Sequence, residues 1–433
     1  MNRRSFLMTP GLLTAREAMS WQGANDRVNL AVVGVRGRGR DHIAGFLQSP
    51  NTRIAAVCDI DQANVERAQA HTQKLSGGSA PAGFSDYRKL LDDKSIHAVS
   101  LATPNHWHAL GAVWAIQAGK DVYGEKPVSH NLREGRVLVQ AARKYKRIVQ
   151  AGHQSRSTPH KIEAMRLLRE GVIGRVYLAK GYCYKRRLSI GHSPDGPVPA
   201  GVDYNTWLGP APERPFNPNR FHYNWHWFWD YGNGDIGNQG VHEMDICRWG
   251  LNLNTLPRRV VSTGGKFVYQ DDQETPNTQS ATFDYGGVQI QFEVRGLLSH
   301  PDGALEFRGN NTIGNTFYGA DGFLSIDANG YQIFKGEKHE LVKEVKLTEN
   351  IWDTRPHFNN FIAAVRSRRF EDLTCDIEQG HLSAALCHLA NISYRTGRSL
   401  RFDPAKETFV NDADANKLLT REYRAPFTLP DPA

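Results

Sequence analysis

Short apolar runs alternate with helical patterns through the first third of the chain. Runs typical of β-strands cover 28–34, 54–59, 97–104, 121–123 and 147–150. Segments with helical spacing of apolar residues separate them, and the clearest extends from Leu132 to Lys146. Strands that alternate with helices in this way predict a parallel, doubly wound sheet. Ligands bind such sheets outside the carboxyl ends of the strands.

The pattern changes after about residue 151. Helical spacing is followed by an expected strand over 174–185 and by a stretch rich in proline, glycine and aromatic residues at 187–230. Six further strands are expected at 258–269, 278–285, 287–297, 303–308, 316–327 and 331–335, with a hairpin turn at Gly286-Gly287. Helical patterns return at 357–368 and 379–394, and Gly397 stops the second. A large, mostly antiparallel sheet is therefore expected here.

A chain of 433 residues is long enough for two domains. We place the first at 26–150 and the second at 151–403, followed by a polar tail at 404–433 that wraps the surface. The composition, 40% hydrophobic and 23% charged, is that of a soluble globular protein. The net charge of +8 is spread along the chain, so a nucleic-acid partner is not expected. No segment is long enough to span a bilayer, and no membrane partner is expected.

The five cysteines are scattered and form no C-x-x-C pair. They are Cys58, Cys183, Cys247, Cys375 and Cys387. This spacing predicts unpaired core thiols and supports neither a disulfide framework nor a zinc site, so no metal is expected.

The N-terminus, residues 1–25, resembles a shortened twin-arginine leader. Asn2-Arg3-Arg4-Ser5-Phe6-Leu7 matches the export motif, but Arg16 and Glu17 interrupt the apolar segment early. Two locations therefore stay open: the periplasm, reached by twin-arginine export, and the cytoplasm.

A glycine-rich turn follows the first strand. In Gly34-Val35-Arg36-Gly37-Arg38-Gly39, Gly34 and Gly39 occupy the first and last glycine positions of G-x-G-x-x-G, and Arg36 occupies the middle one. Such a turn, at a helix N-terminus, presents backbone N–H groups to a pyrophosphate. Arg36 or Arg38 could face a phosphate instead.

Asp59 ends the second strand, at the position where an acid accepts the ribose hydroxyls of a dinucleotide. We therefore prefer NAD, with NADP as the less favoured cofactor. The alternative is that Asp59 caps the helix that starts near Gln62, although Asp61 is also available for that role.

Lys126 lies in Gly124-Glu125-Lys126-Pro127, at the end of the strand 121–123. A lysine held by a proline at this edge suits a proton donor that faces a ligand crevice. Gly34, Asp59 and Thr103-Pro104 also follow strand ends, so we expect them near Lys126. The whole expected cofactor-binding set is Gly34, Arg36, Gly37, Arg38, Gly39, Asp59, Thr103, Pro104, Asn105, His108, Glu125 and Lys126.

A second polar set begins a helical pattern at Asn238. Asn238 and His242 are spaced i, i+4, and His242 and Asp245 are spaced i, i+3, so each pair can share a face. A histidine in this company can relay a proton, whereas a lone helical histidine is more often structural. The aromatic residues before it could stack on sugar rings or fill the core between domains. The expected substrate-binding set is Gln154, Arg156, His222, Trp227, Asn238, His242 and Asp245.

Together these motifs resemble the Gfo/Idh/MocA family of oxidoreductases. The resemblance rests on Gly34–Gly39, Asp59, Thr103-Pro104-Asn105-His106-x-His108, Glu125-Lys126-Pro127 and His242-x-x-Asp245, and it covers about 27–403. Trp207-Leu208-Gly209-Pro210 and the segment 234–242 resemble a bacterial branch whose members often carry twin-arginine leaders. The fold that this implies is an α/β chain with a Rossmann doubly wound parallel sheet and a C-terminal α/β domain. The latter has a large, mostly antiparallel open sheet, through which members usually form homo-oligomers.

The resemblance also implies an activity. It assigns catalysis to Lys126 and His242, with NAD(P)-linked hydride transfer to or from a sugar, cyclitol or related polyol. Many members have an aspartate where this chain has Asn238, which places more of the acid–base work on His242 and Lys126. Two alternatives stay open: a glycosidase that uses transient oxidation, elimination and re-reduction, and a non-catalytic NAD-binding sensor.

Overall fold

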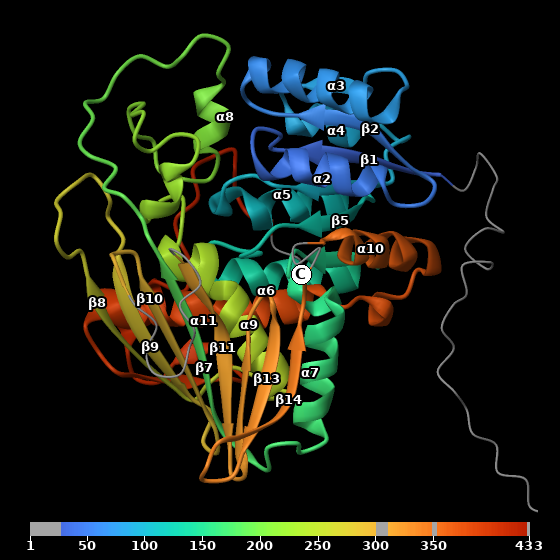
Figure 1. The fold of residues 1–433 in the computed structure, drawn as a ribbon. Coiled ribbons are helices and arrows are strands. Elements are labelled where there is room, and N and C mark those ends of the chain that lie inside the picture. The colour runs from blue at the N-terminus through green and yellow to red at the C-terminus, as the bar shows by residue number, and fades with distance from the viewer. Residues whose placement is uncertain (1–26, 300–310, 349–352, 431–433) are drawn as a thin grey trace, which may run out of the picture.

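The computed structural model describes residues 27–299, 311–348 and 353–430, which form two sheets flanked by helices (Figure 1). The expected leader at 1–25 and the expected strand at 303–308 lie outside these residues. The five cysteines are free and buried, as predicted. No helix in the described ranges is long and apolar enough to cross a membrane.

The first sheet has six parallel strands in the order β3-β2-β1-β4-β5-β6. The strands are β1 (Val28–Val33), β2 (Thr52–Cys58), β3 (Ala82–Phe84), β4 (Ala98–Leu101), β5 (Asp121–Gly124) and β6 (Val149–Ala151). Central strands such as β4 are buried on both faces, which explains their continuous apolar runs. The doubly wound prediction is confirmed. The direction of winding reverses between β1 and β4, where such sheets form a ligand crevice.

Helices connect these strands. They are α2 (Arg38–Leu47), α3 (Gln62–Ser76), α4 (Tyr87–Asp92), α5 (Asn105–Gln117) and α6 (Leu132–Lys144). The side chain of Asp61 caps α3 by accepting a hydrogen bond from the backbone N–H of Ala63. Asp61 therefore takes the capping role that the sequence left open, and Asp59 has other partners.

The second sheet has ten strands in the order β14-β13-β12-β11-β7-β10-β9-β8-β15-β16. The strands are β7 (Val176–Lys185), β8 (Arg259–Gly265), β9 (Thr278–Asp284), β10 (Gln289–Arg295), β11 (Asn311–Gly319), β12 (Gly322–Ile326), β13 (Gly330–Lys335), β14 (Glu340–Lys346), β15 (Leu400–Asp403) and β16 (Thr408–Phe409). The sheet is mostly antiparallel, as predicted, with β7 and β10 paired in parallel. The hairpin at Gly286-Gly287 joins β9 to β10.

Two expectations for this sheet need correction. The single strand expected at 316–327 is a hairpin, β11 and β12, that reverses at Ala320-Asp321. The edge strand β14 was not expected, because its sequence, Glu-Leu-Val-Lys-Glu-Val-Lys, is exposed and lacks an apolar face. Edge strands are often charged in this way, which discourages pairing with other chains.

Further helices pack between and beside the sheets. The α-helices are α7 (Pro159–Arg169), α8 (Tyr204–Leu208), α9 (Val241–Gly250), α10 (Arg355–Ser367), α11 (Ile377–Thr396) and α12 (Ala413–Lys417). The 3-10 helices are η2 (Gln154–Ser157), η3 (Asn224–Trp227) and η5 (Phe370–Asp372), and η4 (Ile236–Gly240) is a π-helix.

Helix α10 packs against helix α2 of the first domain, although the two helices are far apart in the sequence (Figure 1). Phe358 and Phe361 join the core formed by β1, β2 and α2. A Cβ added at Gly45 would lie 2.4 Å from the Phe358 ring, so the glycine permits this contact. The first core is thus completed by a helix from the end of the chain, beyond the predicted boundary at 150.

The aromatic stretch forms a cluster of its own, which we call the aromatic segment (residues 204–231). Its buried members include Trp207, Phe221 and Tyr231. The polar tail crosses this segment, and Phe427 is buried against Trp107 and Leu110 of α5.

Candidate functional site

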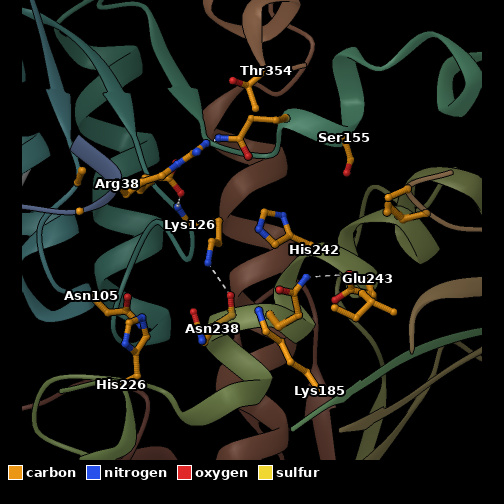
Figure 2. A pocket seen from close by; sticks show the side chains of 18 of the residues that line it. Arg38, Asn105, Lys126, Ser155, Lys185, His226, Asn238, His242, Glu243 and Thr354 are labelled. Carbon is orange, nitrogen blue, oxygen red and sulfur yellow. Dashed lines mark hydrogen bonds and ion pairs between the residues drawn. The ribbon is translucent and has the colours of Figure 1, made fainter. Parts of the chain in front are cut away.

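A cavity of about 1000 Å³ lies between the carboxyl ends of the parallel strands and the second sheet (Figure 2). Gly34, Asp59, Thr103 and Lys126 line it from the first sheet, and His242 lines it from α9. Gly34, Asp59, Thr103 and Lys126 were expected at strand ends and His242 on a helix, and all five line the same cavity.

The glycine-rich turn is close-packed at both ends. Gly34 has φ +81°, and a Cβ there would lie 2.7 Å from the carbonyl oxygen of Ala102. A Cβ on Gly39 would lie 2.2 Å from the carbonyl oxygen of Gly34. Gly39 is buried and lies outside the cavity lining, so its part is to let α2 start against the turn. Arg36 and Gly37 are exposed and line the cavity.

Asp59 points its carboxylate back at the turn. Its Oδ2 accepts from the N–H of Val35 at 2.9 Å, and its Oδ1 accepts from the N–H of Asp61 at 3.1 Å and from Asn64 at 3.3 Å. Burial raises the pKa of Asp59, and these donors oppose the rise. A carboxylate oxygen has two lone pairs, so Asp59 retains acceptor capacity for a ligand.

Arg38 lines the cavity, as expected, and is also paired with Glu125. The Arg38 Nε donates to Glu125 Oε1 at 2.9 Å, and the buried His42 ring lies 3.0 Å from the same oxygen. Burial acts to raise the pKa of Glu125, but Arg38 and His42 outweigh it and hold that pKa well below its ordinary value. Gln154 also donates to Glu125 Oε1, at 3.1 Å. This buried network fixes the residue that precedes Lys126.

Lys126 links the two halves of the molecule. Its Nζ donates to the main-chain carbonyl of Asn238 at 2.5 Å (Figure 2). Burial lowers the pKa of Lys126, although the charge of Glu125 opposes this. An ammonium group has three N–H donors, so two stay available to a ligand.

The backbone around Asn238 is a π-helical turn, η4, and not the α-helix that the pattern predicted. Single π turns inside helices are frequent at functional sites. The side chain of Asn238 donates to Asp235 at 3.3 Å, and Arg187 pairs with Asp235 at 2.6 Å. The negative charge of Asp235 is therefore balanced by Arg187, and Asp235 lies outside the cavity lining.

His242 lines the cavity and lies beside Lys126 (Figure 2). Its ring packs edge-on against that of His153, with centroids 5.6 Å apart. Burial, Lys126 and His153 together hold the pKa of His242 well below its ordinary value. The imidazole is therefore neutral at neutral pH and can accept a proton.

Asp245 does not pair with His242, in contrast to the prediction from their spacing. Its carboxylate accepts from Arg156 at 2.8 and 2.9 Å and from Ser383 at 2.7 Å. The nearest histidine nitrogen is His153 Nδ1, at 3.7 Å. Arg156 and Asp245 are buried outside the cavity lining, so their assignment as substrate contacts is corrected: they clamp η2, α9 and α11 together.

The remaining expected substrate contacts divide into two groups. Gln154 lines the cavity and also donates to Tyr123 at 2.8 Å. His222 lines it too. Burial and then the charge of Arg36 lower the pKa of His222 to about 4, which indicates that His222 lies toward the glycine-rich turn. Trp227 is buried in the aromatic segment outside the lining, where the Arg187 guanidinium lies 5.2 Å from its ring.

The start of α5 also contributes to the cavity. Thr103, Pro104, Asn105 and His108 all line it. Asn105 donates to Asn233 at 3.1 Å, and both nitrogens of His108 lie within 2.7 Å of backbone carbonyl oxygens. His108 therefore links the loop before α5 to the loop after β5. Among the described residues, the side-chain oxygen of Thr103 has no partner.

Sequence reasoning missed four polar residues in or beside the cavity. His153 packs on His242, and Lys161, His226 and Glu243 line the cavity. A signal existed only for Glu243 and His153, which adjoin residues that were selected. The others come from segments with no fixed spacing to the motifs. No group of three or more His, Cys, Asp or Glu side chains suited to a metal occurs within the described chain.

These features define an oxidoreductase with an NAD-binding Rossmann fold. The model of the Gfo/Idh/MocA oxidoreductase family for that fold matches residues 28–153, and the model for its C-terminal α/β domain matches 165–290 and 314–429. The chain belongs to this family.

Several curated relatives are similar to the chain. The uncharacterized oxidoreductase YrbE of Bacillus subtilis is 32% identical over 76% of this chain and 80% of its own. The levoglucosan dehydrogenase of Pseudarthrobacter phenanthrenivorans is 24% identical over 63% of this chain, and the match spans 65% of that enzyme. A glycosyl hydrolase family 109 protein of a Shewanella strain is 27% identical, over about a third of each chain.

Solved structures share the fold. A levoglucosan dehydrogenase in complex with NADH and levoglucosan aligns with a TM-score of 0.66 at 16% identity, covering 87% of this chain and 99% of that one. The WlbA dehydrogenase of Bordetella pertussis, in complex with NADH and UDP-GlcNAcA, aligns with a TM-score of 0.63 at 19% identity, with the same coverage.

The cavity's own residues fit a dinucleotide. The hydroxyl of Thr103 is buried without a partner among the described residues, a Cβ at Gly37 would meet nothing within 4 Å, and Asp59 offers a carboxylate. A dinucleotide could therefore be held by the turn at 34–38, by Asp59 and by Thr103.

Proposed function

We propose that the protein is an NAD-dependent oxidoreductase that acts on a hydroxyl or keto group of a sugar, cyclitol or glycoside. The observation that carries this proposal is that Lys126 and His242 line one cavity close to each other, and that the cofactor-binding turn lines the same cavity. The nicotinamide cofactor, when bound, supplies the hydride acceptor or donor.

The two side chains divide the proton chemistry. In the oxidative direction, His242 accepts the hydroxyl proton, because its low pKa keeps it neutral. Lys126 donates a hydrogen bond to the same oxygen and stabilises its developing negative charge. Asn238 cannot accept a proton, so no carboxylate at that position shares this work.

NAD is the proposed form of the cofactor. The 2′-phosphate of NADP would meet the carboxylate of Asp59, whose hydrogen-bond partners are backbone N–H groups and Asn64, with no cation among them. Arg38, which could have offset this charge, is held by Glu125. Calorimetric titration with both cofactors tests the assignment, and tighter binding of NADP would overturn it.

The catalytic assignment predicts a large loss in two variants. Lys126→Ala and His242→Ala should each lower turnover by about 10²-fold or more, the usual scale for acid–base groups. Turnover is followed by NADH absorbance with a panel of polyols and sugars. Lys89→Ala, on the exposed face of α4, is the matched control and should behave as wild type. Unchanged turnover in both active-site variants would reject the assignment.

A second candidate is a glycosidase that oxidises its substrate transiently with bound NAD, eliminates the glycosidic group, adds water to the resulting double bond and re-reduces the ketone with the bound NADH. The similarity to glycosyl hydrolase family 109 proteins favours it. The same cavity residues would serve both reactions. The discriminating measurement is the cofactor: NADH accumulates with product in a dehydrogenase, whereas bound NAD is recycled without net change in the glycosidase. An NAD-binding sensor would bind cofactor and turn over neither class of compound.

Self-association through the ten-stranded sheet is part of the proposal. The face opposite α9 presents Lys180, Thr282 and Gln291, all partly exposed. Light scattering during size-exclusion chromatography tests it, and a monomer at micromolar concentration would reject it. Mass spectrometry of protein from its native host would show whether residues 1–25 are removed, as export through a leader requires.

A further inference from the structure

Three buried polar side chains line the cavity beyond His242, away from the cofactor-binding turn. They are Lys161 of α7, Glu243 of α9 and Asn315 of β11, which are 8%, 4% and 0% exposed. None of them belongs to the catalytic pair or to the cofactor-binding turn.

Each of the three has unused hydrogen-bonding capacity. Glu243 Oε1 accepts from Gln239 at 3.2 Å, but its Oε2 has no partner among the described residues. Asn315 Nδ2 donates to the main-chain carbonyl of Glu243 at 2.8 Å, and its Oδ1 likewise has no described partner. Lys161 donates to Ser155 at 3.0 Å and has two further N–H groups. Buried polar groups are rarely left unpaired in a protein without a functional reason.

The backbone beneath these residues is shaped to admit them. A Cβ added at Gly181 of β7 would lie 2.9 Å from the Cβ of Glu243 and 3.2 Å from Asn315 Nδ2. Any other residue at 181 would push both side chains from their positions. Glycine inside a strand commonly marks such a close approach.

We propose that Lys161, Glu243 and Asn315 form a hydroxyl-binding subsite, which recognises the substrate at a carbon other than the one oxidised beside His242. The inference rests on the proposed function and deepens it, because it names the residues that select among polyols.

A hydroxyl group suits this set better than a carboxylate. It can accept from Lys161 and donate to Asn315 Oδ1 or to Glu243 at the same time. Lys161 donates to Ser155 and Glu243 accepts from Gln239, and no ion pair within 4.0 Å joins Lys161 to Glu243 in the described chain. Burial raises the pKa of Glu243 to about 8 and lowers that of Lys161. A carboxylate ligand, by contrast, has no hydrogen to donate and would leave the buried Oδ1 of Asn315 without a partner.

The test is calorimetric binding to the NADH-loaded protein. The probes are myo-inositol, its monodeoxy derivatives and sodium D-glucuronate. Wild type should bind myo-inositol and should lose about tenfold in affinity for one deoxy derivative. Glu243→Leu and Lys161→Met should bind myo-inositol about tenfold more weakly and should no longer distinguish that derivative. Glu170→Gln, on the exposed end of α7, is the matched control.

The outcomes separate this inference from the proposed function. Wild-type discrimination retained in both variants would overturn the subsite, even if hydride transfer still depends on Lys126 and His242. Tighter binding of D-glucuronate than of myo-inositol, or no binding of either, would overturn the hydroxyl assignment. If one variant fails to fold, as judged by circular dichroism, the other decides. Failure of the proposed function would instead appear as absent NADH binding, or as turnover that is absent or does not depend on Lys126 and His242.

Discussion

Lys126 has a partner in the protein, the main-chain carbonyl of Asn238, and we propose that a substrate oxygen is its second partner. Its bond to the carbonyl of Asn238 orients the ammonium group, and two N–H donors point elsewhere. His242 feels this nearby charge, which is the second cause of its low pKa after burial. The two catalytic candidates are therefore electrostatically coupled.

This coupling predicts the pH dependence of oxidation. Because His242 must be neutral to accept a proton, kcat/KM should fall only below its ordinary pKa of about 6.5. Removal of the neighbouring charge in Lys126→Met should raise the pKa of His242, so the acid limb of the residual activity should move to higher pH. A pH profile of each protein measures this. An acid limb that stays in place after the substitution would show that the histidine is not the titrating base.

Position 238 offers a second prediction at this scale. Asn238→Asp would set a carboxylate against Asp235, in place of a hydrogen bond of 3.3 Å. We expect a loss of about 1–3 kcal/mol in unfolding free energy at neutral pH, since a bond is lost and like charges meet. The part of the loss that is due to charge should shrink as the pH falls toward about 4, because repulsion makes the new carboxyl group protonate more readily in the folded state. Denaturant titration at several pH values checks this, with Asn238→Ala as the control that adds no charge.

Most site residues at strand ends could be predicted from sequence, since parallel topology brings such ends together. Gly34, Asp59, Thr103 and Lys126 show this. The ion pairs could not be predicted from the sequence, because they join chain segments that are far apart. Arg38 and Glu125, for example, are separated by 87 residues. Both were expected to face a ligand, and they face each other.

At the scale of elements, helix α9 carries the site and is held from two directions. Lys126 contacts the π turn at its start, and Arg156 of η2 pairs with Asp245 in its middle. Ser383 of α11 donates to the same carboxylate. The position of His242 therefore follows from a buried clamp and not from its own hydrogen bonds.

The clamp predicts a stability change without loss of a catalytic group. Asp245→Asn would leave the buried Arg156 without a counter-charge, which typically costs about 3–5 kcal/mol of unfolding free energy. Arg156 holds the pKa of Asp245 well below its ordinary value, against the effect of burial. Stability from the pair is thus present above the ordinary carboxyl pKa of about 3.9 and is lost as the pH falls through the lower folded value. Thermal unfolding measures both effects, and the exposed pair of Arg166 and Glu170 is the control, with an expected cost of 0–1 kcal/mol in Glu170→Gln. An unchanged melting temperature in Asp245→Asn would contradict the clamp.

Elements with a clear apolar period were predictable, and those without one were not. The α6 pattern was read nearly to its ends, since its buried face repeats at helical spacing. The π turn η4 escaped notice because one residue more per turn leaves no mark in a short polar sequence. Strand β14 was missed because its side chains face solvent.

At the scale of the whole molecule, segments near the C-terminus pack against elements of the first domain. Helix α10 closes the first core, and the tail fastens the aromatic segment to α5. Arg424 donates to the carbonyls of Gly209 and Ala211 and to Asn205, while Phe427 is buried beside Trp107. The sequence predicted a tail on the surface but not these contacts, since the tail has no repeating pattern.

The tail contacts predict a change in local dynamics. Phe427→Ala and Arg424→Ala should each raise hydrogen exchange in the aromatic segment, because both remove contacts that immobilise it. Exchange in β4 and β5 should stay unchanged. Mass spectrometry of exchange measures this, with the exposed Glu422→Ala as the control. Equal exchange in all three variants would show that the tail does not restrain the segment.

The bond between Lys126 and Asn238 has a consequence for protein engineering. Its acceptor is a main-chain carbonyl, so no side-chain substitution at 238 removes it as long as the π turn persists. A chimera that joins this nucleotide-binding half to the substrate half of a relative would keep the contact whenever the graft preserves that turn. Substrate-facing side chains can then be varied in such chimeras, while the hydrogen bond between the two domains is kept.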